Sequence, residues 1–234
     1  MRCAIHFIPA IDHPLTVAAA RWLGRDPYTG ARVTAVAEGL IADHHAYLTA
    51  APRRFGFHGC LKAPFALVGH RQLAELEHAL DRFSQTIDPV HVPATRIAMV
   101  DQCFALLPVD PVPALGELAG RVVIEFDSFR RPFAEEESKG HSLRPLNARQ
   151  LSYLLAWGCP DVLDQFRFHM MLTGPVERDE CEHVSAVLHR FFGPLAGAPM
   201  LVDQIALFIE PEPSAPLLVH SVHPLKVRSR RKRA

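Results

Sequence analysis

The chain contains one short pattern twice, and each copy is centred on a histidine. Residues 55–64 read FGFHGCLKAP, and residues 166–175 read FRFHMMLTGP. Both copies follow Phe-x-Phe-His-x-x-Leu, with a proline six residues after the histidine. A duplicated unit of this kind usually packs about a pseudo-twofold axis. We therefore expect His58 and His169 to face each other across one cleft.

Alternation within each copy predicts a strand with one core face and one functional face. Phe55, Phe57 and Leu61 are offset from the histidine by odd numbers, so they would lie on the opposite face of the strand. The face that carries the histidines would then hold Gly56, His58, Cys60 and Lys62 from the first copy, and Arg167, His169, Met171 and Thr173 from the second.

These side chains suit a phosphate ester. Cations such as Lys62 and Arg167 neutralise non-bridging oxygens, and paired imidazoles can act as general acid and base. Arg54 precedes the first copy closely enough to reach the mouth of the cleft, where a guanidinium binds phosphate well. The predicted catalytic residues are His58 and His169, and the predicted substrate-binding residues are Cys60, Lys62, Met171, Thr173, Arg167 and Arg54.

Simpler interpretations exist for each residue. A single histidine in an aromatic strand is usually a packing residue, and only the repeat favours catalysis. Cys60 could be a nucleophile, but a cysteine flanked by apolar residues is usually inert. The adjacent His44 and His45 could suggest a metal site. Their side chains would point in different directions, however, and no nearby carboxylate cluster completes such a site. The five cysteines form no CxxC pair. We expect free thiols, no metal and no cofactor.

Composition sets wider bounds. A chain of 234 residues with 49% hydrophobic residues can bury a substantial core. It has no apolar run near the roughly 20 residues of a membrane span, and its start does not look like a signal peptide, so we expect a cytoplasmic protein.

Residues 226–234 hold six of the 25 basic side chains. We expect them to form a disordered tail, and we expect no nucleic-acid partner because the rest of the chain is acidic.

The order of elements predicts an α+β protein with mainly antiparallel strands. Strand-like segments are Cys3–Ile8, Phe55–Val68, His91–Val100, Cys103–Val109, Met200–Ile209 and Leu217–Val222. Helical patterns follow Asp12 up to Gly24 and cover Leu73–Phe83, Val112–Phe129, Arg149–Trp157 and Asp179–Phe192. Residues 25–53 give no clear pattern.

We predict one bilobal domain: lobe one at about 1–129, a helical insert at about 130–160 that includes Glu135–Glu137, and lobe two at about 161–225. Two pseudo-symmetric sheets with flanking helices would surround the central cleft.

The paired motifs, in the contexts PRRFGFHGCLKAPF and DQFRFHMMLTGPV, resemble the two-histidine (2H) phosphoesterase superfamily. More closely, the chain resembles the DUF1045 family of phosphonate-metabolism proteins found with bacterial C–P lyase genes. The likeness extends through RWLGRD, NARQLSYLLAWG and LFIEPEP. It implies metal-independent hydrolysis of a cyclic phosphodiester, with a phosphoribosyl cyclic phosphate as the candidate substrate, and a functional association with C–P lyase pathway enzymes. One histidine would deprotonate water while the other protonates the leaving alkoxide.

The chain departs from the superfamily pattern at one position in each motif. The superfamily has His-x-Thr or His-x-Ser, whereas this chain has Cys60 and Met171. Cysteine is a weak hydrogen-bond donor and methionine is none, although Lys62 and Thr173 could compensate. Two other functions therefore stay open. One is a catalytically impaired homologue that binds a phosphate ligand as a sensor or scaffold, and the other is an RNA-end-processing 2H protein.

Overall fold

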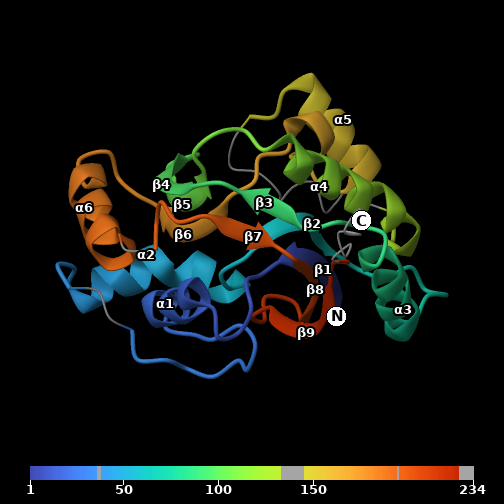
Figure 1. Ribbon diagram of the computed structural model, residues 1–234, viewed down its shortest axis with the longest axis horizontal. Coiled ribbons are helices and arrows are strands. Elements are labelled where there is room, and N and C mark those ends of the chain that lie inside the picture. The colour runs from blue at the N-terminus through green and yellow to red at the C-terminus, as the bar shows by residue number, and fades with distance from the viewer. Residues whose placement is uncertain (36–37, 133–144, 194, 227–234) are drawn as a thin grey trace, which may run out of the picture.

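The computed structural model describes residues 1–35, 38–132, 145–193 and 195–226. The glutamates Glu135–Glu137 and all but the first residue of the basic tail lie outside this part of the chain. Seven of its strands form one sheet in the order β4-β5-β6-β2-β1-β8-β9, and every recorded pairing is antiparallel (Figure 1). The strands are β1 (Arg2–Phe7), β2 (Gly59–Phe65), β4 (Thr95–Val100), β5 (Cys103–Pro108), β6 (Met170–Pro175), β8 (Gln204–Glu210) and β9 (Leu218–Pro224).

The α+β class and the antiparallel strands are confirmed, but the two predicted sheets are one continuous sheet. The two halves join where β2 lies next to β6. A separate small ladder pairs β3 (Val90–Val92) with β7 (Met200–Val202). These pairings join residues far apart in the chain, and hydrophobic alternation alone does not specify such partners.

The strand order is symmetric about its centre. Moving outward from the central pair β6 and β2, the neighbours are β5 and β1, and then β4 and β8, while β9 extends one edge. The halves of the sheet therefore interleave along the chain, because β4 and β5 precede β6 in sequence whereas β8 and β9 join β1. They do not follow the sequential lobe boundaries expected near residues 130–160.

The described helices are α1 (Pro14–Leu23), α2 (Ala42–Phe55), α3 (Leu73–Ser84), α4 (Pro113–Glu125), α5 (Ala148–Trp157) and α6 (Cys181–Phe192). Short 3-10 helices occur at Asp127–Phe129 and Leu163–Gln165. In Figure 1, α1, α2 and α6 gather on one side of the view, and α3, α4 and α5 gather on the other. The cap of α1 is His13, whose Nδ1 accepts a hydrogen bond from the Leu15 amide.

Helix α2 occupies much of the stretch that the sequence left unassigned. It contains Pro52, a residue that removes a helical hydrogen bond and usually signals a helix boundary. Its end at Gly56 has a φ of 80°, and a Cβ there would lie 2.8 Å from a carbon of Pro27. The predicted strand from Phe55 is therefore too long at its start: Phe55 is the last helical residue, and β2 begins at Gly59.

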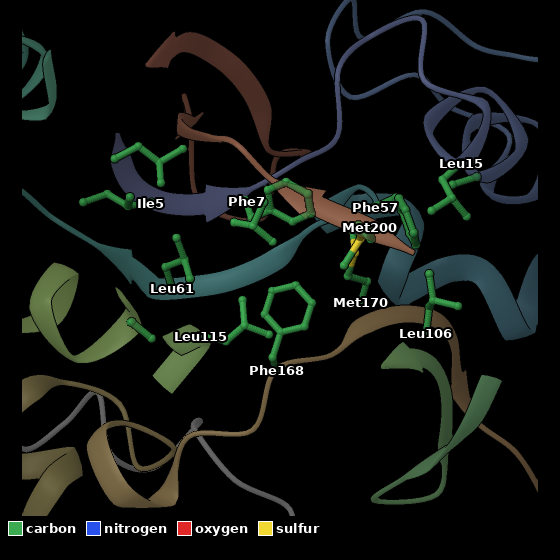
Figure 2. Packing of buried hydrophobic residues seen from close by; sticks show 14 of the residues in the cluster. Ile5, Phe7, Leu15, Phe57, Leu61, Leu106, Leu115, Phe168, Met170 and Met200 are labelled. Carbon is green, nitrogen blue, oxygen red and sulfur yellow. The ribbon is translucent and has the colours of Figure 1, made fainter. Parts of the chain in front are cut away.

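The core lies on the sheet face opposite the motif histidines. Phe57 and Phe168, which directly precede those histidines, are both buried, as are Leu61 and Leu172. Figure 2 shows Phe7 and Phe168, from segments far apart in the chain, with their side chains pointing toward each other. The alternation within the motifs thus correctly identified these core residues, except for the helical Phe55.

Candidate active site

The two motif copies meet at equivalent positions. The recorded register between β2 and β6 pairs Gly59 with Met170, and each of these residues directly follows its motif histidine. In an antiparallel pair of strands, a local twofold axis passes through such a residue pair. It relates the residue before Gly59 to the residue before Met170. His58 and His169 therefore lie on the same face of adjacent strands, diagonal to each other.

Both histidines make the same backbone contact. Nδ1 of His58 lies 2.9 Å from the carbonyl oxygen of Gly56, and Nδ1 of His169 lies 2.8 Å from that of Arg167. A carbonyl only accepts, so each neutral ring must carry its proton on Nδ1 and donate it there. Nε2 of each ring is then left with a lone pair. The two motifs thus fix the same tautomer in both histidines.

A cavity of about 310 Å³ adjoins His58 on this face of the sheet. Its polar lining groups are two imidazoles, two thiols and one hydroxyl, and of the described residues no lysine or arginine lines it. The lining residues are His6, Ala51, Pro52, Phe55, Gly56, His58, Cys60, Pro64, Cys103, Met171, Thr173, Gly174 and Pro175. The structure thus brings together four of the predicted residues: His58, Cys60, Met171 and Thr173. His169 is partly buried and does not line this cavity.

His6 is a residue of the site that the sequence analysis missed. Its ring stacks on the ring of His58, with centroids 3.9 Å apart and planes inclined by 28°. The His6 ring also lies at a tilt to the ring of Phe208, with centroids 5.0 Å apart. Since Ile5 and Phe7 belong to the core, alternation along β1 could have placed His6 on the opposite face.

Burial sets the protonation states at the site. Desolvation lowers the pKa of His58 to about 4, with a small further lowering from His169, against the effect of the Gly56 carbonyl. The pKa of His6 is lowered well below its ordinary value, first by burial and then by His58. Burial also raises the pKa of the Cys60 thiol, and Cys159 and Asp161 add to this effect. Cys60 is therefore a protonated thiol, which argues against a nucleophilic role.

Lys62 does not share the histidine face. An irregularity in the β1–β2 register lies beside it, pairing Ile5 with Lys62 but His6 with Cys60. Lys62 is buried, and its Nζ donates to the carbonyl of Val123 at 3.2 Å and to Asp127 at 3.3 Å. It joins β2 to the end of α4 and cannot replace the missing motif hydroxyls. A bulge of this kind leaves no sign in the sequence pattern.

The two predicted arginines also lie away from the cavity. Arg54 pairs with the buried carboxylate of Glu210, and Arg167 forms an exposed pair with Asp101 at 3.2 Å. Thr173, in contrast, lies where alternation placed it. Its Oγ1 accepts a hydrogen bond from the Phe104 amide at 2.9 Å, and its proton remains available to donate.

Within the part of the chain that the structure describes, no group of three or more histidine, cysteine or acidic side chains is arranged to hold a metal ion. None of the helices found there combines the length and apolar character needed to cross a membrane.

The fold and site together define an antiparallel α+β protein with two symmetry-related histidines on adjacent strands, one of which, His58, lines a largely apolar cavity. The chain belongs to the DUF1045 family, described as a protein of unknown function, which it matches over residues 60–218. This agrees with the family resemblance noted from the motifs.

Curated relatives and solved structures extend the comparison. Two proteins named ribose 1,5-bisphosphate phosphokinase PhnN align over 222 residues: that of Janthinobacterium sp. (strain Marseille) is 32% identical and that of Laribacter hongkongensis (strain HLHK9) 28%. The alignments cover 93% and 92% of this chain but only 49% and 50% of the relatives, so the chain spans about half of their length.

Among solved structures, a phosphoesterase aligns with 12% identity over 97% of this chain and 99% of its own, and E. coli LigT complexed with 3′-AMP aligns with 11% identity over 97% and 98%. Both have a TM-score of 0.42. At that score the likeness supports no inference about activity.

Proposed function

We propose that this protein is a metal-independent phosphoesterase that hydrolyses a cyclic phosphodiester through His58 and His169. The observation that carries the proposal is the matched pair of histidines. Each directly precedes one of two adjacent strands, faces the same side, and has its tautomer fixed by a carbonyl two residues earlier. Paired imidazoles with free Nε2 atoms are suited to moving protons on and off an ester.

The proposed roles differ between the two rings. Because burial holds the pKa of His58 near 4, its imidazole is neutral at pH 7, which is the form that a base requires. His58 Nε2 would accept a proton from water as the water oxygen attacks phosphorus. One ring P–O bond breaks, and protonated His169 donates its proton to the departing alkoxide. The products are a phosphate monoester and a free hydroxyl.

The proposed substrate is a phosphoribosyl cyclic phosphate formed in phosphonate breakdown, alongside C–P lyase pathway enzymes. The curated relatives support a phosphorylated ribose, because their name specifies ribose 1,5-bisphosphate. Their phosphokinase activity is not part of the proposed function. The chain matches only half of those proteins, and its sequence contains no G-x-x-x-x-G-K-S/T phosphate-binding loop.

The direct test is turnover of ribose 1,2-cyclic phosphate by the purified protein in EDTA. We expect His58→Ala and His169→Ala each to lower kcat by at least about 100-fold, because general acid and base groups contribute about 10²–10⁴-fold. His78→Ala, at an exposed position on α3, is the matched control and should keep full activity. Full activity in either motif variant, or loss of activity to EDTA, would contradict the proposal.

A second candidate function is binding of a phosphate ligand without efficient turnover. The observation that favours it is the pair Cys60 and Met171, which line the cavity at the motif positions expected to hold a hydroxyl. Losing one preorganised donor of this type costs about 10²–10³-fold in rate.

The double variant Cys60→Thr/Met171→Thr separates the two functions. If the natural protein is an enzyme limited by missing donors, we expect the variant to raise kcat by about tenfold or more. If the natural protein binds the cyclic phosphate but shows no turnover, while the double variant hydrolyses it, then the natural site is a binding site. An unchanged kcat in an active natural protein would show that these positions are not limiting.

A further inference from the structure

His6 is an unusual buried histidine. It is 1% exposed, and neither Nδ1 nor Nε2 has a hydrogen-bond partner within the described residues. The neighbouring Ile5 backbone acts weakly on the ring without completing a hydrogen bond. Buried polar groups almost always find a partner, so two orphaned nitrogens on one ring require an explanation.

The position of the His6 ring supplies an explanation for its two unpaired nitrogens. His6 lines the same cavity as His58 and Thr173, and its stacking on His58, together with its tilted contact with Phe208, restrains the plane of the ring. The remaining lining is mostly apolar or weakly polar. A group that enters this cavity thus meets one imidazole available for catalysis and a second imidazole with both nitrogens unsatisfied.

We propose that His6 is a specificity residue that binds a hydroxyl group of the substrate, and that the cavity therefore selects sugar cyclic phosphates over cyclic phosphates without hydroxyls. This inference rests on the proposed function. A neutral imidazole offers one donor and one acceptor, which is the complement of a hydroxyl group, whereas a phosphate oxygen can only accept. A site built to bind a hydroxyl rejects ligands that lack one, since its polar groups are then left unpaired.

Two ligands test the proposal: ribose 1,2-cyclic phosphate, and ethylene phosphate, a five-membered cyclic phosphate with no hydroxyl. Affinities are measured by calorimetry in a His169→Ala background so that turnover does not consume the ligand, and kcat/KM is measured in the natural background. His6→Phe keeps a stacking ring but removes both nitrogens. We expect it to weaken binding of the ribose ester about 10- to 100-fold and to leave ethylene phosphate within about twofold.

Two further variants keep the test falsifiable. His6→Gln retains a donor and an acceptor and should restore part of the preference for the ribose ester. His45→Phe is the matched control for replacing a buried histidine, because His45 packs against Trp22 at 4.7 Å and does not line the cavity. It should leave the preference unchanged, and the melting temperature of each variant checks its folding.

The possible outcomes separate this inference from the proposed function. A preference that survives in His6→Phe overturns the role of His6, even if the natural protein hydrolyses both esters. A preference that depends on His6, in a natural protein that hydrolyses neither, supports the hydroxyl site and overturns the hydrolysis. Failure of the natural protein to bind either ester overturns both.

Discussion

A neutral histidine that is shielded from solvent, His58, makes the stability of this protein depend on pH. The pKa of His58 falls from 6.5 to about 4 on burial. In the unfolded chain this histidine takes up a proton near pH 6.5, so the unfolded state gains free energy as the pH falls below that value. The contribution of His58 is fully present above about pH 6.5 and is lost as the pH falls toward 4. At roughly 1.4 kcal/mol per pKa unit, the loss is at most about 3.5 kcal/mol.

Urea unfolding measured from pH 7 to pH 4 tests this expectation. The free energy of unfolding should fall over this interval, and the fall should be smaller in His58→Gln. The exposed His78→Gln is the control and should leave the pH dependence unchanged. An identical dependence in His58→Gln and the natural protein would show that His58 titrates normally when folded.

At the level of single residues, the sequence predicted the site in part. Alternation correctly placed His58, Cys60, Met171 and Thr173 on one face, because they lie at or beside regular strands. It failed for Lys62, where a register irregularity reverses the face, and for Arg54, which pairs with a residue 156 positions away. His6 lay outside the repeated motif, and only its pairing with Cys60 brings it to the site.

The close contact between the two motif copies depends on Gly59, which has no side chain. A Cβ at Gly59 would lie 2.5 Å from a ring carbon of Phe168, which precedes the second motif histidine. We expect Gly59→Ala to displace this ring and to lower the free energy of unfolding by about 1–3 kcal/mol, the usual cost of overpacking a core. Because Gly59 is the residue of β2 that pairs with β6, beside both motif histidines, catalysis should fall as well.

Gly116 on α4 provides the matched control. A Cβ at this position would meet nothing within 4 Å. Gly116→Ala should raise stability by about 0.5–1 kcal/mol, since alanine favours a helix interior more than glycine does. Chemical denaturation of both variants gives the comparison. A Gly59→Ala protein as stable as the natural one would mean that the Phe168 ring can move at little cost.

Elements with a regular apolar pattern could be predicted from the sequence. Helices α3 and α6 have clear apolar faces, and the observed limits, Leu73–Ser84 and Cys181–Phe192, lie close to the predicted ones. Helix α2 was missed because Pro52 breaks its pattern and its packing against β6 stabilises it instead. Local signals thus predicted the elements that do not depend on a distant partner.

For the molecule as a whole, Glu210 joins three distant segments. This carboxylate on β8 is 1% exposed and accepts hydrogen bonds from Arg2 on β1 and Arg54 on α2. Burial alone would raise the pKa of Glu210, but the two guanidinium groups outweigh it and lower the pKa. The stabilisation is therefore present above the ordinary pKa of about 4.5 and is lost as the pH falls below it.

Glu210→Gln removes the charge and keeps the shape of the side chain. We expect the free energy of unfolding at pH 7 to fall by about 1–3 kcal/mol, because two partly exposed arginines lose a charged partner. Asp101→Asn, in the exposed pair with Arg167, should change it by less than about 1 kcal/mol. Equal effects of the two substitutions in thermal unfolding would contradict the proposed role of Glu210.

The interleaved order of the strands also constrains how the chain can fold. One of the two neighbours of strand β1 is β8, so the backbone hydrogen bonds of residues 2–7 cannot all form until residues 204–210 are present. Contacts between segments this far apart in sequence slow folding. During synthesis the first strand therefore leaves the ribosome long before its outer neighbour exists. One edge of the nascent sheet stays open to other chains until β8 has been made.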